Sequence, residues 1–358
     1  MPKRIFFHSV LILLPFLVME AVFRLLPVSD SRDVLAVSSQ DPVARMRPNT
    51  DYLFSKGWNF SIVARKHTNN FGYNNVSDYH PDQTTPLLMV IGDSFVEGYA
   101  VDAGKSAAEI LNFGVDGNAR VYSIGVSEAP LSQYLVFAQF SRATFRPAAM
   151  AFVIAENDFD ESLLKYKSLG RFHYFEETAG GLALRRVDYQ PSMARTILRK
   201  SALVRYVMLN LGAIHIYNDL RRRLFRGGRS ATLAQRIADS KAAVDHFLDQ
   251  VPASAGLDSG SIVFVLDALR PAIYSPESLQ EAGNSYFGQM RRYFAAQAGA
   301  RGFQVLDMQP VFIGRHRADS SRFEFRTDFH WNELANQLVA EEIRKSALFR
   351  RIFGNGEH

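Results

Sequence analysis

The sequence predicts a three-layer α/β domain in which helices cover both faces of a five-stranded parallel sheet. Five short apolar runs recur along the chain, with helix-like segments between or after them. Short buried strands that alternate with helices are typical of such a sheet. The expected strands are residues 87–91, 121–124, 149–154, 262–266 and 303–306. The expected helices are residues 105–113, 130–140, 231–251, 276–298 and 332–349.

The composition excludes several classes of protein. The 358 residues include 47% hydrophobic and 22% charged residues, with a formal net charge of +5, which excludes a mostly disordered chain. Because there is no cysteine, disulfides, thiolate metal sites and a cysteine nucleophile are excluded. The histidines lack metal-ligand spacing, and no phosphate-binding or dinucleotide-binding loop occurs, so we expect no metal and no cofactor.

Residues 1–27 are expected to form a basic cytoplasmic tip and a transmembrane signal anchor. Residues 5–26 are mostly apolar, and as a helix they would span about 33 Å, against about 30 Å for a bilayer core. The alternatives are a cleaved signal peptide and a buried amphipathic helix, because Glu20 and Arg24 interrupt the stretch. Lys3 and Arg4 place the N-terminus in the cytoplasm. The expected location is therefore the bacterial inner membrane, single-pass, with the catalytic domain facing the periplasm.

The rest of the chain divides into a spacer with short strands at 28–85 and the main domain at 86–350. Residues 160–230 interrupt the alternation of strands and helices, and we expect them to form an inserted cap or lid. Residues 195–229 hold nine Lys and Arg but one acidic residue. This basic stretch fits a solvated helix face, or a contact with anionic lipid or an acidic substrate. No nucleic-acid-binding motif accompanies it, so nucleic acid is not an expected partner, and the sequence predicts no oligomeric state.

Reactive residue types occur at the predicted strand ends and before the last helix. Ser94 follows the first strand of the predicted sheet, Gly125 ends the second, and Asn157 follows the third. Asp328 and His330 precede the terminal helix. Because the carboxyl ends of parallel strands meet at one edge of a sheet, we expect these residues to lie together.

Together these residue types supply the parts of an acyl-transfer site. A serine is the nucleophile, and a histidine oriented by a carboxylate is its base. A glycine lets a backbone N–H approach a ligand closely, and a side-chain amide stabilises an oxyanion. Taken singly, each motif is more often a turn or a helix cap, so the prediction depends on the set as a whole.

The motifs resemble those of the SGNH/GDSL hydrolase superfamily, in its membrane-anchored bacterial type. Ser94, in Gly-Asp-Ser, matches the nucleophile of its first block. Gly125 and Asn157 match the second and third blocks, and Asp328 and His330 match the last. The resemblance implies a Ser94–His330–Asp328 triad, an oxyanion hole of Ser94, Gly125 and Asn157, and a flavodoxin-like fold. It also implies hydrolysis of an acyl ester of a carbohydrate or lipid.

The resemblance covers about residues 87–348, and two positions differ from the family pattern. The family places its acid three residues before the histidine, where this chain has Thr327, and it commonly has glycine at Glu128. The order Asp-x-His-Trp is also similar to that of alginate-type O-acetyltransferases. Three functions therefore remain open: a membrane-anchored serine esterase or deacylase, a polysaccharide O-acetyltransferase that uses the same triad, and a catalytically silent domain that binds glycan or a partner.

Overall fold

The computed structural model describes residues 2–82, 84–114, 120–214, 216 and 231–354. These residues form two compact units, each built from three stretches of chain. The larger unit contains Val34–Thr50, His67–Gln190 and Ala231–His358, and the smaller contains Met1–Asp33, Asp51–Lys66 and Pro191–Ser230. Segments far apart in the sequence pack together in each unit, and the expected division at residues 27 and 85 stays a prediction.

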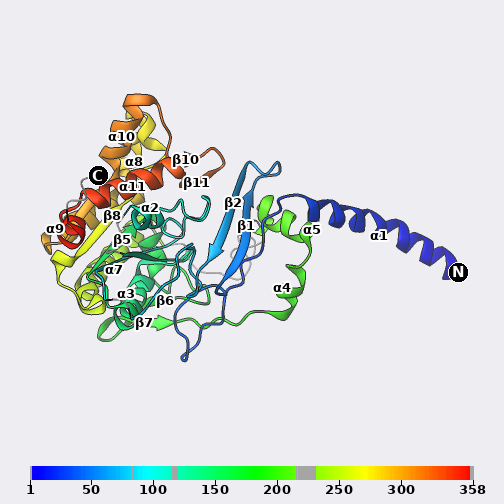
Figure 1. Cartoon of the computed structure of the whole chain (residues 1–358), viewed down its shortest axis with the longest axis horizontal. Coiled ribbons are helices and arrows are strands. Elements are labelled where there is room, and N and C mark those ends of the chain that lie inside the picture. The colour runs from blue at the N-terminus through cyan, green and yellow to red at the C-terminus, as the bar shows by residue number, and fades with distance from the viewer. Residues whose placement is uncertain (1, 83, 115–119, 215, 217–230, 355–358) are drawn as a thin grey trace. The chain divides into compact units, whose positions relative to one another are not determined.

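The larger unit contains a five-stranded parallel sheet, as predicted (Figure 1). Its strands are β3 (Leu87–Gly92), β4 (Arg120–Gly125), β5 (Ala149–Ile154), β8 (Ile262–Leu266) and β9 (Gln304–Asp307). Their spatial order is β4-β3-β5-β8-β9, with every neighbouring pair parallel. Numbered along the chain, this is the 2-1-3-4-5 order of flavodoxin-like sheets, which bind ligands where the order reverses beside the first strand.

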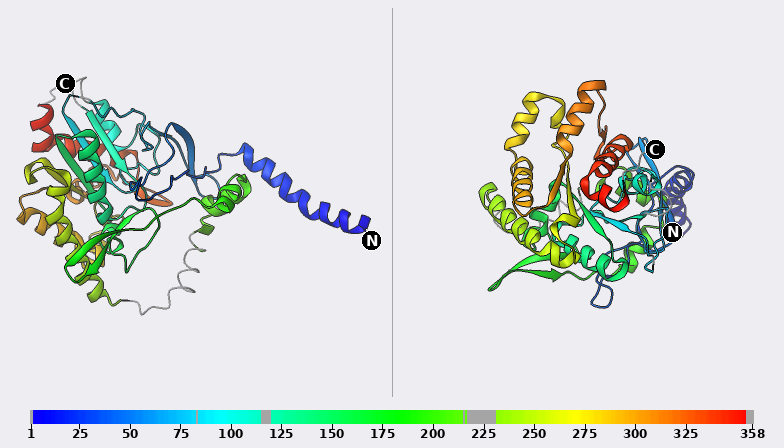
Figure 2. Two further views of the ribbon diagram at one scale, coloured as in Figure 1. Left: turned by 90° about the horizontal axis from the view of Figure 1, so that it is seen from below. Right: turned by 60° about the vertical axis from the view of Figure 1, so that its left-hand side comes forward.

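Helices cover both faces of this sheet, because each strand buries side chains on both sides (Figure 2). Met89 and Ile91 of β3 lie in one core cluster, and Leu88 and Val90 lie in the other. The first cluster includes residues of α3 (Leu131–Phe145), α7 (Leu233–Ala255) and α9 (Tyr286–Ala300). The second includes residues of α2 (Ala107–Phe113), α10 (Met308–Asp319), α11 (Glu333–Lys345) and α12 (Ala347–Phe353). The three-layer arrangement is therefore present.

Two expected helices are each divided by a serine. The stretch expected at 276–298 forms α8 (Pro276–Asn284) and α9, because the Ser285 hydroxyl accepts a hydrogen bond from the Gly288 N–H and caps a new helix. Ser346 caps α12 in the same way, through the N–H of Phe349. The sequence did not predict α10, which contains a proline and a glycine and buries only two of its side chains, Met308 and Phe312.

The shorter elements of the larger unit include a hairpin in the insertion. Its strands are β6 (His173–Thr178) and β7 (Gly181–Arg186), which are antiparallel. The hairpin packs on α3, where the Ser132 hydroxyl donates to the His173 carbonyl oxygen over 2.8 Å. The remaining short elements are η1 (Glu156–Asp158), η2 (Asp160–Ser162), η4 (Ser259–Ser261), η5 (Ala272–Tyr274), β10 (Glu324–Phe325) and β11 (Asp328–Trp331). A lid function for the insertion stays a prediction.

The smaller unit joins the N-terminal helix to a two-stranded sheet and to the second half of the insertion. Its elements are α1 (Pro2–Leu25), β1 (Thr50–Lys56), β2 (Ile62–Thr68), α4 (Met193–Leu198), α5 (Ala202–Arg205) and η3 (Tyr206–Asn210). Glu20 of α1 accepts hydrogen bonds from the N–H groups of Ala202 and Leu203 and from the Ser201 hydroxyl. These bonds, that of Leu203 above all, lower the pKa of Glu20 to about 2. The Phe23 and Tyr206 rings stack beside this cap, 4.2 Å between centroids.

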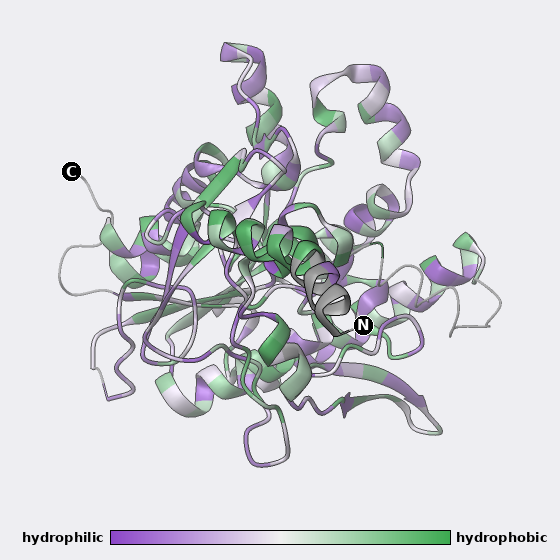
Figure 3. Ribbon diagram, turned by 90° about the vertical axis from the view of Figure 1, so that its right-hand side faces the viewer, coloured by the Kyte–Doolittle hydropathy of each residue, from purple (hydrophilic) through white to green (hydrophobic). Residues whose placement is uncertain are grey.

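Hydrophobic residues predominate along α1, where the sequence predicts the transmembrane segment (Figure 3). Within the described part of the chain, no helix is both long and apolar enough to span a membrane, so the predicted span is not supported. The helix contains Pro15, Glu20 and Arg24, and the Glu20 carboxylate caps another helix of the same unit. Most of the basic stretch at 195–229 lies outside the described residues.

A buried glutamate stands out in the larger unit. Glu109 of α2 is 1% exposed, and neither of its carboxylate oxygens has a hydrogen-bond partner among the described residues. Burial raises its pKa to about 7, although the nearby backbone N–H groups of Val76 and Ser77 act in the opposite direction without reaching hydrogen-bond geometry. Folding therefore favours the neutral form of this side chain.

We predict that Glu109→Gln stabilises the protein above neutral pH. Because folding raises the pKa from 4.5 to about 7, the contribution of Glu109 to stability is fully present below pH 4.5 and is lost as the pH rises through 7. At pH 8 the variant should gain about 3 kcal/mol in free energy of unfolding, and at pH 4.5 almost nothing. Urea unfolding at both pH values measures this. The exposed Glu281→Gln is the control, and an equal gain at both pH values would contradict the prediction.

Candidate active site

The turn after β3 places Ser94 at the carboxyl end of the sheet. The Asp93 carboxylate accepts a hydrogen bond from the N–H of Phe95 (3.0 Å), which closes the turn around the serine. The Glu97 N–H donates to the Asp93 carbonyl and the Tyr99 N–H to the Ser94 carbonyl, both over 3.0 Å. Ser94 is therefore held by backbone on both sides and is only 7% exposed.

Asp328 and His330 reach Ser94 from β11. Side chains two residues apart in a strand lie on the same face, so the Asp-x-His spacing directs both groups to one side. The Asp328 Oδ1 lies 2.5 Å from the His330 Nδ1, and the His330 Nε2 lies 2.8 Å from the Ser94 Oγ. Asp328 also accepts the His330 backbone N–H over 2.9 Å. Asp328, rather than the residue three before the histidine, is the carboxylate that contacts the ring.

With a neutral imidazole, these contacts fit one tautomer of His330. The carboxylate of Asp328 accepts the proton on Nδ1, which leaves Nε2 of His330 as the acceptor for the Ser94 hydroxyl. A neutral imidazole in this tautomer is able to take the serine proton. The three side chains therefore have the connections that a nucleophile, its base and an orienting acid require.

The Asp93 carboxyl connects Asn157, which follows β5, to Ser94. Its Oδ2 accepts a hydrogen bond from the Asn157 amide (3.2 Å) and lies 3.4 Å from the Ser94 Oγ. Burial raises the pKa of Asp93, while the hydrogen bond from the Phe95 N–H lowers it in part. The structure therefore brings Asn157 next to the Asp93–Ser94 turn, and sequence reasoning assigned no such linking role to Asp93.

A second buried carboxyl holds the turn that carries Asn157. Asp158 accepts hydrogen bonds from the N–H of Ala155 (2.6 Å) and from the hydroxyl of Tyr134 on α3 (2.7 Å). Burial raises its pKa well above the usual value, and the nearby Asp93 raises it further. These contacts fix η1 directly after β5, and so fix the position of Asn157.

Gly125 ends β4 beside Gly92, the last residue of β3. A Cβ at Gly125 would lie 2.2 Å from the Glu97 backbone N, so only glycine fits at this approach. Glu97 then binds the next turn, because its Oε2 accepts the N–H (2.6 Å) and the hydroxyl (2.5 Å) of Ser127. Glu97 was missed by sequence reasoning, although it follows Ser94 by three residues. The turns after β3 and β4 are thus packed and hydrogen-bonded together.

Glu128 is accommodated outside this packed region. Its φ is +71°, a left-handed conformation that glycine adopts most easily. Its side chain is exposed and forms an ion pair with Arg171 over 2.8 Å. The positive charge of Arg171 balances the negative charge of the Glu128 carboxylate.

Aromatic rings surround His330. The Phe329 ring stacks on the imidazole with 4.5 Å between centroids, Tyr99 lies at 4.5 Å and Phe95 at 5.3 Å. Phe329 is 63% exposed, an unusual state for a phenylalanine. The imidazole of His330 therefore lies among three aromatic rings, one of which, that of Phe329, is exposed.

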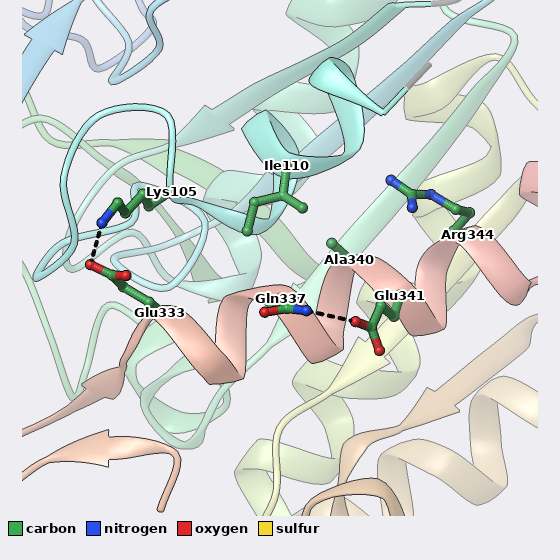
Figure 4. Close-up of a pocket in the computed structure, with 7 residues that line it drawn as sticks. All are labelled: Lys105, Ile110, Glu333, Gln337, Ala340, Glu341 and Arg344. Atoms are coloured by element: carbon green, nitrogen blue, oxygen red, sulfur yellow. Dashed lines mark hydrogen bonds and ion pairs between the residues drawn. The ribbon is translucent and has the colours of Figure 1, made fainter. Parts of the chain in front are cut away.

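A separate groove lies between α2 and α11 (Figure 4). Lys105 and Glu333 form an ion pair at one end, and Gln337 donates a hydrogen bond to Glu341. Its lining residues are Lys105, Ile110, Glu333, Gln337, Ala340, Glu341 and Arg344. Because none of the predicted site residues belongs to this set, we do not assign the site chemistry to this groove.

Comparisons with known proteins give matches of structure but not of sequence. No protein-family model matches the chain, and no curated protein is similar to it in sequence. The structure is similar to a lipolytic protein of the G-D-S-L family from Veillonella parvula DSM 2008, at 12% identity and a TM-score of 0.39, covering 74% of this chain and 98% of that one. It is also similar to a lipase/acylhydrolase from Enterococcus faecalis, at 12% identity and a TM-score of 0.41, covering 75% and 96%. An acetyl xylan esterase is similar at 8% identity and a TM-score of 0.41, covering 73% and 99%.

We predict that Gly125→Ala destabilises the larger unit. The added methyl would meet the Glu97 backbone rather than a movable side chain, so relief requires a shift of the turn that carries Ser94. The expected loss is about 1–3 kcal/mol or more, measured by urea unfolding. Gly299→Ala is the matched control, because nothing lies within 4 Å of a Cβ there and the residue is in a helix. A Gly125→Ala protein as stable as the wild type would contradict the close approach.

Proposed function

We propose that the protein is a serine ester hydrolase of the SGNH type that removes an acyl group from a carbohydrate or lipid. One observation carries this proposal: the unbroken chain of contacts from Asp328 through His330 to the Ser94 Oγ. The position of this chain of contacts at the carboxyl ends of β3 and β5 also supports it, because ligands bind there in flavodoxin-like sheets.

In the first half of the reaction, Ser94 attacks the carbonyl carbon of the ester. His330 takes the hydroxyl proton on Nε2 as the bond forms, and Asp328 stabilises the resulting imidazolium. The oxyanion accepts hydrogen bonds from the N–H groups of Ser94 and Gly125 and from the Asn157 amide. The intermediate collapses, the alcohol leaves with the proton from His330, and the acyl group stays on Ser94.

In the second half, water attacks the acyl-enzyme. His330 accepts a proton from the water, a second tetrahedral intermediate forms in the same oxyanion hole, and its collapse returns the proton to Ser94. The products are the carboxylic acid and free enzyme. If a sugar hydroxyl replaces the water, the same site performs O-acyl transfer.

The alternative of acyl transfer rests on the Asp-x-His-Trp order. The Trp331 ring is buried, and its Nε1–H donates to the Asp267 carboxylate over 2.9 Å. That contact serves the packing of β11 and is compatible with either acceptor. Location at the bacterial inner membrane, with this site facing the periplasm, stays a prediction.

We predict that the full-length protein hydrolyses p-nitrophenyl acetate and that Ser94→Ala abolishes this turnover. Loss of the nucleophile should cost on the order of 1,000-fold or more in kcat, without loss of the folded state by circular dichroism. Ser278→Ala, an exposed serine of α8, is the control and should keep wild-type activity.

The same assay separates the alternatives. A sugar acceptor that diverts acetyl groups from water would favour the transferase. A folded wild type that neither hydrolyses the ester nor reacts with a serine-directed phosphonate would contradict the proposal and favour the silent binding domain.

We predict that Asn157→Ala lowers kcat by about 100- to 1,000-fold, the usual effect of removing one oxyanion donor. The amide carries the donor that the oxyanion requires, so KM should change much less than kcat. Steady-state kinetics measures both constants. Gln337→Ala, which removes an amide from the groove between α2 and α11, is the control, and wild-type kcat in Asn157→Ala would remove Asn157 from the mechanism.

A further inference from the structure

The strand that carries the acid and base of the site has little support of its own. β11 has four residues, its one strand partner among the described residues is the two-residue β10, and the register shifts between Glu324 and Phe325. It is not a strand of the five-stranded sheet. A two-stranded ribbon of this length is marginal in water by itself, so something else must hold Asp328 and His330 in place.

Arg270 supplies one such contact from the end of β8. Its Nη1 donates to the carbonyl oxygen of Phe329 over 2.8 Å. Phe329 is the residue between Asp328 and His330. The guanidinium also lies over the ring of Phe95, 5.5 Å from its centroid, and Phe95 directly follows Ser94. One side chain therefore contacts neighbours of all three residues of the site.

Asp267, which follows β8, orients Arg270 and makes a second contact to β11. Its two carboxylate oxygens bind the Nε (3.1 Å) and the Nη2 (2.7 Å) of Arg270, a bidentate pair with a fixed geometry. Its Oδ1 also accepts the Nε1–H of Trp331 over 2.9 Å. The contacts on residues 329 and 331 thus bracket His330 and connect it to the main sheet.

The cost of burying this pair argues that it does more than stabilise the fold. The Arg270 and Asp267 side chains are 4% and 6% exposed. Removing two charges from water costs several kcal/mol for each ion, so apolar side chains of similar volume often stabilise a protein as well or better. Directional hydrogen bonds to a carbonyl and to an indole N–H, in contrast, require polar partners in fixed positions.

We propose that Arg270, oriented by Asp267, is a positioning residue that fixes β11 so that His330 stays within hydrogen-bond reach of Ser94. The inference rests on the proposed function, because it assigns Arg270 to the same reaction. Arg270 touches neither the ester nor the reacting atoms in this scheme. Its loss should lower kcat through misplacement of the base and leave substrate binding almost unchanged.

The test compares two conservative variants with one control. Arg270→Lys keeps the charge but loses the planar fork, and Trp331→Phe removes the indole N–H while keeping an aromatic ring. In both, kcat for p-nitrophenyl acetate should fall by about 10- to 100-fold, the effect of a displacement near 1 Å, with KM within about twofold of wild type. Arg322→Lys is the matched control, because Arg322 donates to Glu324 of β10 but its side chain is 60% exposed.

A second readout does not depend on esterase activity. The ring resonances of His330, one of nine histidines, are assigned in ¹⁵N-histidine-labelled protein with the His330→Gln variant. They should shift or broaden in Arg270→Lys and Trp331→Phe and stay unchanged in Arg322→Lys. If the wild type hydrolyses no ester, the proposed function fails, and these resonances still decide whether Arg270 positions His330.

Folded Arg270→Lys and Trp331→Phe proteins with wild-type kcat and unchanged His330 resonances would overturn the proposal. If Arg270→Lys does not fold, Arg270→Ala is refolded with methylguanidinium, which should restore the wild-type resonances. The kcat and the His330 resonances of Trp331→Phe are measured in the same experiment. Recovery of the fold by methylguanidinium without recovery of the His330 resonances would equally count against a positioning role.

Discussion

The buried carboxyl of Asp93 is the contact on which the arrangement of the site depends. It accepts the Phe95 N–H that shapes the turn around Ser94, and it binds the amide of Asn157 from the next strand. This carboxylate is a hydrogen-bond acceptor for groups that follow both β3 and β5. Burial disfavours its charge, and this cost is offset by donors that come from both strands. The Asp93 carboxylate thus holds Ser94, after β3, and Asn157, after β5, in fixed positions relative to each other.

The site combines two kinds of support. Gly125 ends a strand of the sheet, and Ser94 and Asn157 follow two neighbouring strands directly, where parallel pairing and close packing at Gly125 leave little freedom. Asp328 and His330 come from a short ribbon, which depends on polar contacts with residues after β8. The sheet side carries the proposed nucleophile and oxyanion donors. The ribbon carries the proposed proton acceptor, whose position relative to the serine sets the rate of proton transfer in the proposed reaction.

Local pattern was sufficient to predict the strands of the sheet. Each expected strand ends within one residue of the observed one, because a buried strand is an uninterrupted apolar run between polar turns. Helix boundaries were less accurate: Ser285 and Ser346 act as caps, and serine inside a helical pattern does not reveal whether its hydroxyl turns to the backbone. The transmembrane segment was inferred from the length and composition of residues 5–26 and from the flanking Lys3 and Arg4, but no helix among the described residues is long and apolar enough to span a membrane.

The residues of the site were predicted from their types and their order, but their supporting contacts were not. Arg270 and Asp267 are three residues apart, a spacing that exposed ion pairs such as Lys345–Glu342 also have. Nothing in the sequence indicates that the Arg270–Asp267 pair is buried against β11. Glu97 and Asp158 were missed for the same reason, since Glu97 binds Ser127 in the turn after another strand and Asp158 binds Tyr134 of α3. Sequence patterns report which face of an element is apolar, whereas these contacts depend on how the ends of elements meet.

The chain passes from one compact unit to the other after residues 33, 50, 66, 190 and 230. During synthesis, α1 leaves the ribosome before the residues that bind Glu20, which follow about 180 positions later. The contacts between Glu20 and α5 therefore form only after β3, β4 and β5 have been made. Apolar side chains of α1 such as Leu13 and Leu17 are exposed in the folded chain as well, so this helix offers an apolar surface both before and after that step.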